Sequence, residues 1–534
     1  MIQVSIAKKK VTTDNGTIIY LHQNNALDLE FTREAFGYEA EHKGWFREGD
    51  RLYILDEAID IQEAISELQR DAPPSILDET LPKLGIEESE RELFQMDDGA
   101  VVKWIRHPSA LPEICQPHWR DHQLFIEINN PRLSYVAYHS IHRLAVLEGG
   151  DNIPRYFAPG GLRWIDYESK EAAISDALDM SLAVSMKIQV TGTPCAGSKV
   201  SIFGDYRKKP EVLGSIGAAM ERLGLNISAA DLGLSTKDMQ TYILPAAPTF
   251  TVPIGVYKGG TGAAMITYLG VFEGLRGMAG SLSGSPKVGD ITVSMQGLGE
   301  VGVGLARLLI AEGTKLIIAE INPVTITQFK KEFPTSFESG QVQFLEDPDL
   351  IFDSKADIFC PCALRDILND DNLNRLLKAG VKMVGGPANN LFPDQIKGPW
   401  IYHNAGLIVV PYEGIGAGGT AGVAHSIMTG IFGKCPFEPQ EKVDRIGRYV
   451  QKIIDLSQSY DLPPQVISDR ILFRRVKRRT IVTQETAFDI MEILASALSS
   501  KNLKLEKTIV DEYTKTGFFY GKGCFPNGGW KYLQ

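Results

Sequence analysis

Cysteine is scarce in this chain, with six residues among 534. Cys360 and Cys362 form the one close pair in the sequence, and the other four are scattered. A single intervening residue is poor geometry for two ligands of one zinc ion, and no histidine cluster accompanies the pair. The sequence therefore argues against a disulfide framework and against a metal site, and we interpret Cys360 and Cys362 as structural.

Long apolar runs and an excess of positive charge are also lacking. No stretch approaches the roughly twenty apolar residues of a membrane helix. The amino terminus, MIQVSIAKKKVTTDNG, has its basic residues after a short strand-like run, unlike a signal peptide. Lys and Arg number 55 against 66 Asp and Glu, a net charge of −11. We therefore expect a cytoplasmic protein that binds neither nucleic acid nor a membrane surface.

The pattern of expected strands and helices divides the sequence into four regions. The first mixes the short β-type runs TIIYLHQ and DRLYILDEA with one helical segment, IDIQEAISELQR (59–70), and a proline-rich joint, and it carries no catalytic motif. The second and third alternate strands with helices, which is typical of α/β layers. The expected boundaries give an N-terminal α+β extension (1–118), two α/β regions (119–260 and 261–439) and a C-terminal tail (481–534), with residues 440–480 completing the first α/β region.

The strongest local motif lies in residues 290–322, DITVSMQGLGEVGVGLARLLIAEGTKLIIAEIN. An apolar strand leads into Gly297-x-Gly299-x-x-Gly302, a helix follows, and a second strand ends in Glu320. Glycines at these positions allow a tight turn, the approach of a pyrophosphate and close packing of helix on strand. The alternative is a glycine-rich turn in an unliganded domain. The cofactor contacts predicted in this segment are Gly297, Gly299, Glu300, Val301, Gly302 and Glu320.

The residues around Glu320 also indicate which dinucleotide binds. A carboxylate at this position accepts hydrogen bonds from ribose hydroxyls and repels a 2′-phosphate. The following INPVTIT offers no Arg or Lys to reverse that preference. The sequence therefore favours NAD over NADP.

Two lysines, Lys187 and Lys199, stand twelve residues apart in VSMKIQVTGTPCAGSKVSIFGD. Neighbouring cations repel each other, so at least one of the amines should lose proton affinity if the site is dry. Two solvated surface lysines are the alternative.

Further segments carry a family resemblance. ADIFCPCALRDILNDDNLNRL (356–376), VGGPANNLF (384–392) and VVPYEGIGAGGTAGVAHS (409–426) resemble the glutamate/leucine/phenylalanine/valine dehydrogenase family, most of all its leucine and phenylalanine dehydrogenase branch. The upstream motifs agree in order, and the resemblance spans about residues 121–480. It implies an α/β fold with a substrate domain at 119–260, a Rossmann NAD-binding domain after it, and a homo-oligomer.

The resemblance also implies roles for individual residues. Lys187 corresponds to the lysine that binds the substrate carboxylate, and Lys199 to the catalytic base. Asp231 corresponds to the aspartate that relays protons at the substrate nitrogen, and Asn390 helps to hold the carboxylate. The remaining implied contacts are Gly160, Gly161 and Ala229 for the substrate, and Thr267, Ala363 and Asn389 for the cofactor.

These residues suit the conversion of an L-amino acid, NAD and water into a 2-oxo acid, ammonia and NADH. The substrate carboxylate needs a cation, and the reaction needs a base that is neutral near pH 7, which a crowded lysine supplies. Gly414 and Gly416 would leave room for a bulky hydrophobic or aromatic side chain, whereas Glu413 would favour a polar one. The alternatives are a specialised-pathway relative acting on an unusual amino or imino acid, and an NAD-binding regulatory module without turnover.

The chain departs from the family pattern directly before Lys199. Three glycines usually stand there, and this chain has Ala196, Gly197 and Ser198. Side chains at two of these positions are expected to alter the path of the loop. Nearby, Arg163 in GGLRW either supports the carboxylate site or forms a salt bridge.

Overall fold

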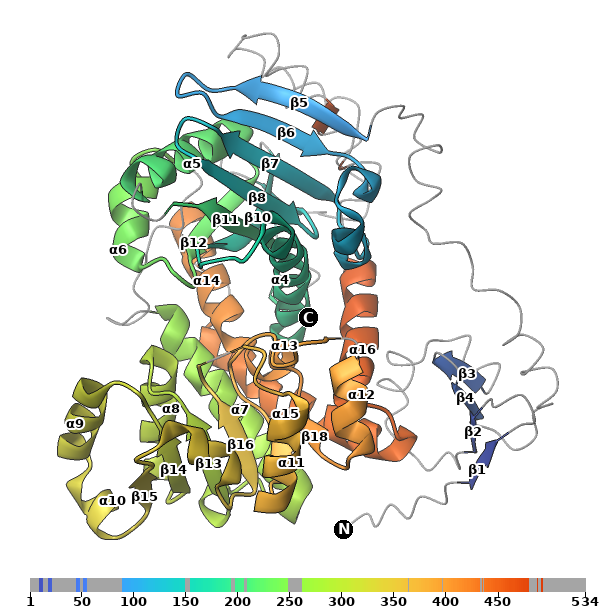
Figure 1. Cartoon of the computed structure of the whole chain (residues 1–534), viewed down its shortest axis with the longest axis vertical. Coiled ribbons are helices and arrows are strands. Elements are labelled where there is room, and N and C mark those ends of the chain that lie inside the picture. Colours follow the sequence, from blue (N-terminus) through green and yellow to red (C-terminus); the bar gives the residue numbers. More distant parts are fainter. Residues whose placement is uncertain are drawn as a thin grey trace. The chain divides into compact units, whose positions relative to one another are not determined.

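The computed structural model (Figure 1) divides the chain into two compact units. Unit 1 comprises residues 1–74, 267–418 and 443–478, and unit 2 comprises 75–266, 419–442 and 479–534. The predicted helix at 59–70 and nearly all of the predicted tail lie outside the described residues. The structure describes residues 9–12, 18–21, 45–48, 51–54, 89–148, 154–193, 197–205, 209–247, 262–363, 365–395, 397–432, 435, 437–479, 487, 491 and 492.

The amino-terminal strands form a four-stranded sheet in the order β1-β2-β4-β3. The middle pair, β2 and β4, is parallel, and the outer pairs are antiparallel. The β-type runs TIIYLHQ and DRLYILDEA were predicted as strands, and they contain β2 and β4. The bounds are β1 (Lys9–Thr12), β2 (Ile18–Leu21), β3 (Trp45–Glu48) and β4 (Arg51–Ile54).

Unit 2 is built on an eight-stranded mixed sheet, which can be followed in Figure 1. The order is β12-β10-β11-β8-β7-β6-β5, with β9 pairing β10. β10 runs parallel to β11 and β12, and the other pairs are antiparallel. The bounds are β5 (Glu90–Gln95), β6 (Val101–Ile105), β7 (Leu124–Asn130), β8 (Tyr135–Ile141), β9 (Ala145–Glu148), β10 (Pro154–Arg163), β11 (Ser198–Gly204) and β12 (Asn226–Ala230).

Alternation along β11 sends successive side chains to opposite faces of this sheet. Val200 and Ile202 join an apolar core that includes Val212 and Ile216 of α5. Ser201, between them, bonds to Asp176 of α4 on the other face. Two helices therefore cover the two faces. The helical segments of unit 2 are η1 (Pro108–Ala110), η2 (Glu113–His118), α4 (Lys170–Thr191), α5 (Lys209–Leu223), α6 (Thr236–Asp238), η4 (Met239–Ile243) and most of α14 (Gly418–Phe432).

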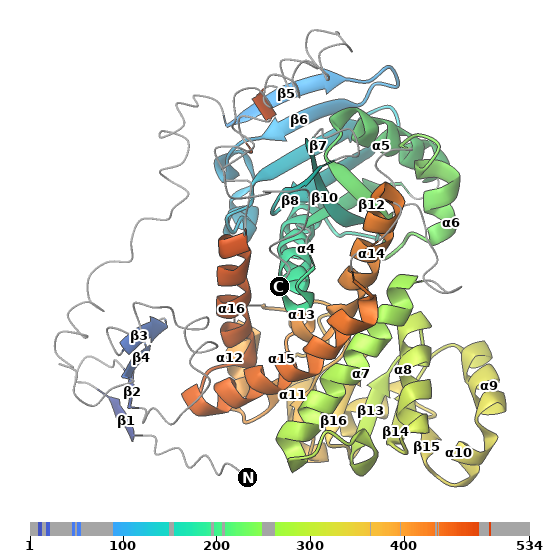
Figure 2. The same ribbon diagram turned by 180° about the vertical axis from the view of Figure 1, so that it is seen from behind.

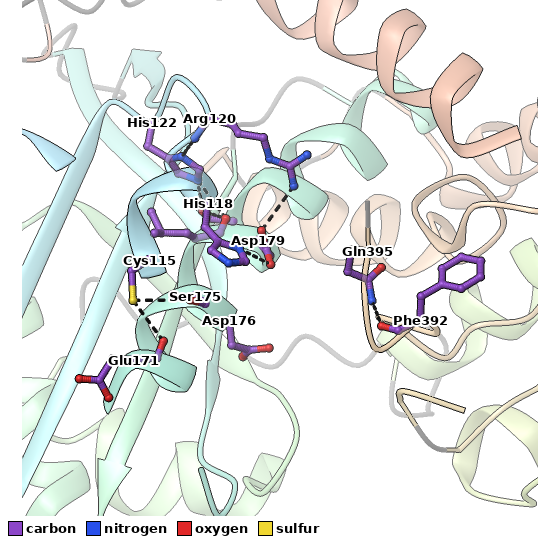
Figure 3. Close-up of polar contacts among 12 residues, drawn as sticks. Cys115, His118, Arg120, His122, Glu171, Ser175, Asp176, Asp179, Phe392 and Gln395 are labelled. Atoms are coloured by element: carbon purple, nitrogen blue, oxygen red, sulfur yellow. Dashed lines mark hydrogen bonds and ion pairs between the residues drawn. The ribbon is translucent and has the colours of Figure 1, made fainter. Parts of the chain in front are cut away.

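Helix α4 has clear start and stop signals in the sequence. The Ser169 side chain accepts a hydrogen bond from the backbone amide of Ala172, and Gly192 ends the helix with φ +64°. The segment that includes η2 is tied to its first half, as Figure 3 shows. His118 lies 2.9 Å from Asp179, and Arg120 reaches the same carboxylate.

Unit 1 contains a six-stranded parallel sheet in the order β15-β14-β13-β16-β17-β18. Numbered from the first strand of the sheet, this is 3-2-1-4-5-6, the Rossmann order, with its switch point between β13 and β16. The predicted α/β fold class and its Rossmann domain are confirmed. The strands are β13 (Thr292–Gln296), β14 (Lys315–Ala319), β15 (Val342–Phe344), β16 (Ile358–Pro361), β17 (Met383–Val384) and β18 (Ile408–Val409).

Glycines allow two long helices of unit 1 to cross closely (Figure 2). A Cβ on Gly277 of α7 would stand 2.3 Å from the carbonyl oxygen of Gly447 in α15. The helical segments are α7 (Gly262–Ser283), η6 (Val288–Asp290), α8 (Glu300–Ala311), α9 (Pro323–Glu332), α10 (Pro334–Glu338), η7 (Pro348–Asp353), α11 (Asp370–Ala379), α12 (Lys397–Asn404), α13 (Tyr412–Ile415), α15 (Pro439–Tyr460) and α16 (Pro464–Arg479).

The course of the chain differs in detail from the expected domain boundaries. The boundary at 118/119 falls between η2 and β7, yet β5 and β6 before it belong to the same sheet as β7. Residues 443–478, expected to complete the substrate domain, group with unit 1. Among the described residues of the expected tail, Ala487 and Met491 lie in the core of unit 2. None of the helices described in the structure is long and apolar enough to cross a membrane.

Candidate active site

Lys199 and Asp231, the two predicted catalytic residues, meet at one end of the unit 2 sheet. Lys199 lies in β11 opposite Gly161 of β10, and Asp231 directly follows β12. The Lys199 ammonium group donates a hydrogen bond to Oδ2 of Asp231. Lys199 is buried, whereas the Asp231 side chain is 23% exposed. The structure therefore gathers the predicted proton-transfer residues into one site, in which the carboxylate is the more exposed of the two groups.

The predicted glycine pair leaves space for these two side chains. A Cβ on Gly161 would stand 2.8 Å from Cβ of Asp231 and 3.3 Å from Nζ of Lys199. A Cβ on Gly160 would stand 2.2 Å from the Ser198 carbonyl oxygen. Ala229 pairs with Gly161 on its other side, in β12. Of the small residues predicted to contact substrate, Gly161 therefore borders the ion pair directly, and Gly160 and Ala229 are its neighbours in the sheet.

Arg163 links this ion pair to helix α4. Its Nε donates to Oδ2 of Asp231 at 3.0 Å, and its Nη1 donates to both oxygens of Asp176 at 2.9 and 3.2 Å. Asp176 also accepts hydrogen bonds from Tyr167 at 2.7 Å and from Ser201 at 3.3 Å. The sequence left two roles open for Arg163, a salt bridge or support of the substrate site. In the structure it forms salt bridges, and one of them is to Asp231 of the candidate site.

Burial and charge shift the proton affinities of these groups. Burial lowers the pKa of Lys199, and Arg163 lowers it further, against the opposing effect of Asp231. Burial alone would raise the pKa of Asp231, but Arg163 and Lys199 hold it below its usual range. Burial likewise opposes the charge of Arg163, yet the two carboxylates raise its pKa. A weakened amine beside a persistent carboxylate suits proton transfer.

Ser198 stands directly before Lys199, where the family usually has its third glycine, and its side chain fits into the sheet. Ser198 is buried and donates a hydrogen bond of 2.8 Å to the carbonyl oxygen of Ala158 in β10. Gly197 packs its backbone onto α4, since a Cβ there would lie 2.4 Å from the Ser185 hydroxyl oxygen. Ala196 lies outside the described residues. The serine therefore ties β11 to β10 immediately beside the lysine.

Lys187, the predicted carboxylate-binding cation, is half-buried near the end of α4. The sequence pairs it with Lys199 as a repelling neighbour. In the structure Arg163 is a cation that lowers the pKa of Lys199. The effect expected of a neighbouring cation is therefore present at Lys199.

The predicted dinucleotide motif forms the turn between β13 and α8. Gly297 has φ +97° and touches Ala363, while a Cβ on Gly302 would stand 2.3 Å from the Gly297 carbonyl oxygen. By contrast, a Cβ on Gly299 would meet nothing within 4 Å. Gly299 precedes α8, and no side chain caps the helix there. The turn therefore leaves open space at the start of a helix, where an anion is favoured.

Glu320 stands at the end of β14, as predicted. Its Oε2 accepts a hydrogen bond of 2.5 Å from the Leu298 amide within the glycine turn. Its Oε1 accepts bonds of 2.8 Å from the amides of Ile321 and Asn322. The carboxylate is thus fixed beside the turn. Open space at Gly299, an uncapped helix start and this fixed acid together fit the pyrophosphate and ribose of a dinucleotide.

The remaining predicted residues of unit 1 lie around the same sheet. Thr267 is half-buried in α7. Asn389 and Asn390 follow β17, and the segment is bonded to the end of β16 through the Ala388 amide and the Pro361 carbonyl oxygen. Asn390 is buried with φ +51°, a conformation that asparagine adopts more easily than most residues. Glu300 and Val301, also predicted, form the first turn of α8.

Sequence reasoning missed Asp176, the carboxylate that accepts from Arg163, and the hydroxyls of Tyr167 and Ser201 that donate to Asp176. A signal for Asp176 was present. It lies in AISDALDM with Ala173 three residues before it and Met180 four residues after it, so its position falls on the apolar face of a helix. A carboxylate on such a face needs a buried partner.

Among the described residues, no group of three or more His, Cys, Asp or Glu side chains could hold a metal ion. Cys115, Cys360 and Cys362 are thiols that form no disulfide with another residue that the structure describes.

Comparison with known proteins shows that this chain is similar to amino acid dehydrogenases in sequence and in fold. The family model described as Glutamate/Leucine/Phenylalanine/Valine dehydrogenase matches residues 259–429. Leucine dehydrogenase from Bacillus subtilis is 31% identical over 325 residues, covering 60% of this chain and 84% of that protein. Valine dehydrogenase from Streptomyces coelicolor is 30% identical over 327 residues, covering 60% and 85%. The crystal structure of L-tryptophan dehydrogenase from Nostoc punctiforme shares the fold, with a TM-score of 0.52, 24% identity and coverage of 67% and 97%.

Proposed function

The chain belongs to the Glutamate/Leucine/Phenylalanine/Valine dehydrogenase family, and we propose that it catalyses the NAD-dependent oxidative deamination of an L-amino acid. It is an oxidoreductase of the amino acid dehydrogenase type. The observation that carries the proposed chemistry is the contact between Lys199 and Asp231, in which Arg163 and burial weaken the amine.

Each residue has a task in this reaction. Lys187 is the cation for the substrate carboxylate, and Asn390 supports it. Lys199 takes a proton from water, which attacks the carbon left electron-poor when the Cα hydrogen departs as hydride. Asp231 moves the proton to the departing nitrogen. Gly161 keeps the space above Lys199 and Asp231 free of a side chain.

NAD, when bound, supplies the hydride acceptor. The amides at the start of α8 would hold its pyrophosphate, and Glu320 would hold the adenine ribose. The segment after Glu320 carries no cation before Lys330 that would welcome a 2′-phosphate. Thr267, Ala363 and Asn389 are the further cofactor contacts that we propose.

The substrate we propose is a bulky hydrophobic or aromatic amino acid. The ring of Tyr449 occupies the space beside Gly414, since a Cβ there would stand 2.9 Å from that ring, so the proposal of a bulky substrate does not rest on this glycine. Glu413 is buried, and Gln465 donates a 3.4 Å bond to it, so its charge is engaged within unit 1. A homo-oligomer is part of the proposal, and sedimentation of the purified chain tests it.

The deciding experiment follows NADH formation with a panel of L-amino acids, using NAD and then NADP. Lys199→Ala should lower turnover by about 10²–10⁴-fold, the usual contribution of a general base. The matched control is Lys103→Ala, because this lysine pairs with Glu90 and its side chain is 37% exposed. NAD binding without turnover in either direction would refute the proposal and favour a regulatory module. Equal turnover of the Lys199→Ala variant would refute the assigned base.

A further inference from the structure

Arg163 connects the proposed proton-transfer pair to helix α4. We propose that Arg163 is a positioning residue that holds Asp231 as a carboxylate against Lys199 and keeps the amine ready to accept a proton. The inference rests on the proposed function, because the reaction requires a neutral amine beside a charged carboxylate. It goes beyond that function by assigning a role to a residue that does not meet the reacting atoms.

The geometry fixes Asp231 from behind. Arg163 ends β10 and is 2% exposed. A single oxygen, Oδ2 of Asp231, accepts from both Nε of Arg163 and Nζ of Lys199. The guanidinium group is planar, so its bond to Asp176 on the other side sets the direction of its Nε. Asp231 is therefore oriented by a rigid group that is anchored on a helix.

The anchor itself is held by several bonds. Tyr167 and Ser201 both donate to Oδ2 of Asp176, from the segment after β10 and from β11. Nη2 of Arg163 is buried and has no hydrogen-bond partner in the described part of the chain. An arginine that served stability alone would satisfy all its donors, because an unsatisfied buried donor is costly. The arrangement therefore orients Arg163 toward Asp231 at the expense of a hydrogen bond to its own Nη2.

The charges around Lys199 come from three elements and differ in sign. β10 supplies Arg163, the residue after β12 is Asp231, and α4 supplies Asp176; α4 also carries Lys187, about three turns beyond. Apart from burial, Arg163 lowers the pKa of Lys199, whereas Asp176 and Asp231 raise it. Removing Arg163 and removing Asp176 should therefore shift the basicity of Lys199 in opposite directions.

This opposition provides the test. The acid limb of the pH profile of kcat/KM reports deprotonation of Lys199. In Arg163→Gln this limb should move up by about one pH unit, which is about a tenfold loss at a pH on the limb. In Asp176→Asn it should move down. A merely structural network would lose activity in both variants without opposite shifts, and that result would overturn the proposal.

Controls separate this inference from its premise. Arg120→Gln removes a 47% exposed arginine paired with Asp179 of α4 and should leave the limb in place (Figure 3). If Arg163→Gln does not fold, Asp176→Asn decides alone: an unmoved limb refutes the role. The pH dependence of Lys199 acetylation by acetic anhydride, measured by mass spectrometry, gives the same shifts without turnover. Opposite shifts there in an inactive wild-type protein would support this inference and refute the proposed function.

Discussion

Substituting Gly160 by alanine tests how strictly strand spacing positions Lys199. Gly160 lies opposite Ser198 across the β10–β11 pair, and a Cβ there would stand 2.2 Å from the Ser198 carbonyl oxygen. Real Cβ contacts essentially never fall below 3.0 Å, so the strands must separate by at least 3.0 − 2.2 = 0.8 Å. Lys199 is the next residue and would move with Ser198. A displacement near 1 Å costs on the order of 100-fold in rate.

The assay is kcat/KM for amino acid oxidation at saturating NAD, with the thermal midpoint measured in parallel. We expect about a 100-fold loss for Gly160→Ala in a protein that still folds. Adding Ser198→Gly should not restore activity, because the clash is with a backbone oxygen. The control is Gly214→Ala in α5, where a Cβ meets nothing within 4 Å; it should stabilise by about 0.5–1 kcal/mol and leave activity unchanged. A kcat/KM within twofold of wild type for Gly160→Ala would refute the reasoning.

Three further predictions concern the cofactor turn, the strand anchor and acid stability. Gly302→Ala should lower the thermal midpoint of the free protein, because its Cβ would stand 2.3 Å from a backbone oxygen. Gly299→Ala should keep the wild-type midpoint and weaken NAD binding in calorimetry. Equal thermal midpoints for the two variants would contradict this prediction. Ser198→Ala should cost about 1 kcal/mol in urea unfolding through the lost bond to Ala158; no loss would show that the bond contributes nothing. The depressed pKa of Asp231 adds stability above its unfolded value of about 3.9, which is lost as pH falls below it. Urea midpoints should therefore fall less in Asp231→Asn than in wild type between about pH 5 and 3, and parallel falls would disprove this.

Local patterns predicted part of the molecule well. The strand, glycine turn, helix and acid of residues 290–322 appear as β13, α8 and β14 with Glu320 at the end, because each signal acts within a few residues. The segment KEAAISDALDMSLAVSMK (170–187), predicted as a helix, lies within α4, which continues to Thr191. The separate roles of Lys199 and Asp231 were implied by resemblance alone, and the structure brings the two side chains together.

Long-range partners were less accessible to sequence reasoning. Arg163 and Asp176 are thirteen residues apart, and neither a strand nor a helix period joins them. Strands β5 and β6 were assigned to a separate extension, since antiparallel pairing to β7 depends on tertiary contacts that texture does not reveal. The sequence of a strand indicates that it pairs with another strand, but its neighbour in the sheet depends on tertiary packing.

The carboxyl-terminal residues of unit 2 have a consequence for the order of synthesis. Ala487 and Met491 complete its apolar core, and Glu492 contacts Arg91 and Arg106, 401 and 386 residues earlier. The ribosome makes the sheet strands of unit 2 before the Rossmann domain, and these core residues only after it. The core of unit 2 therefore stays unfinished while the Rossmann domain is translated, and its last residues can pack only after that domain has been made.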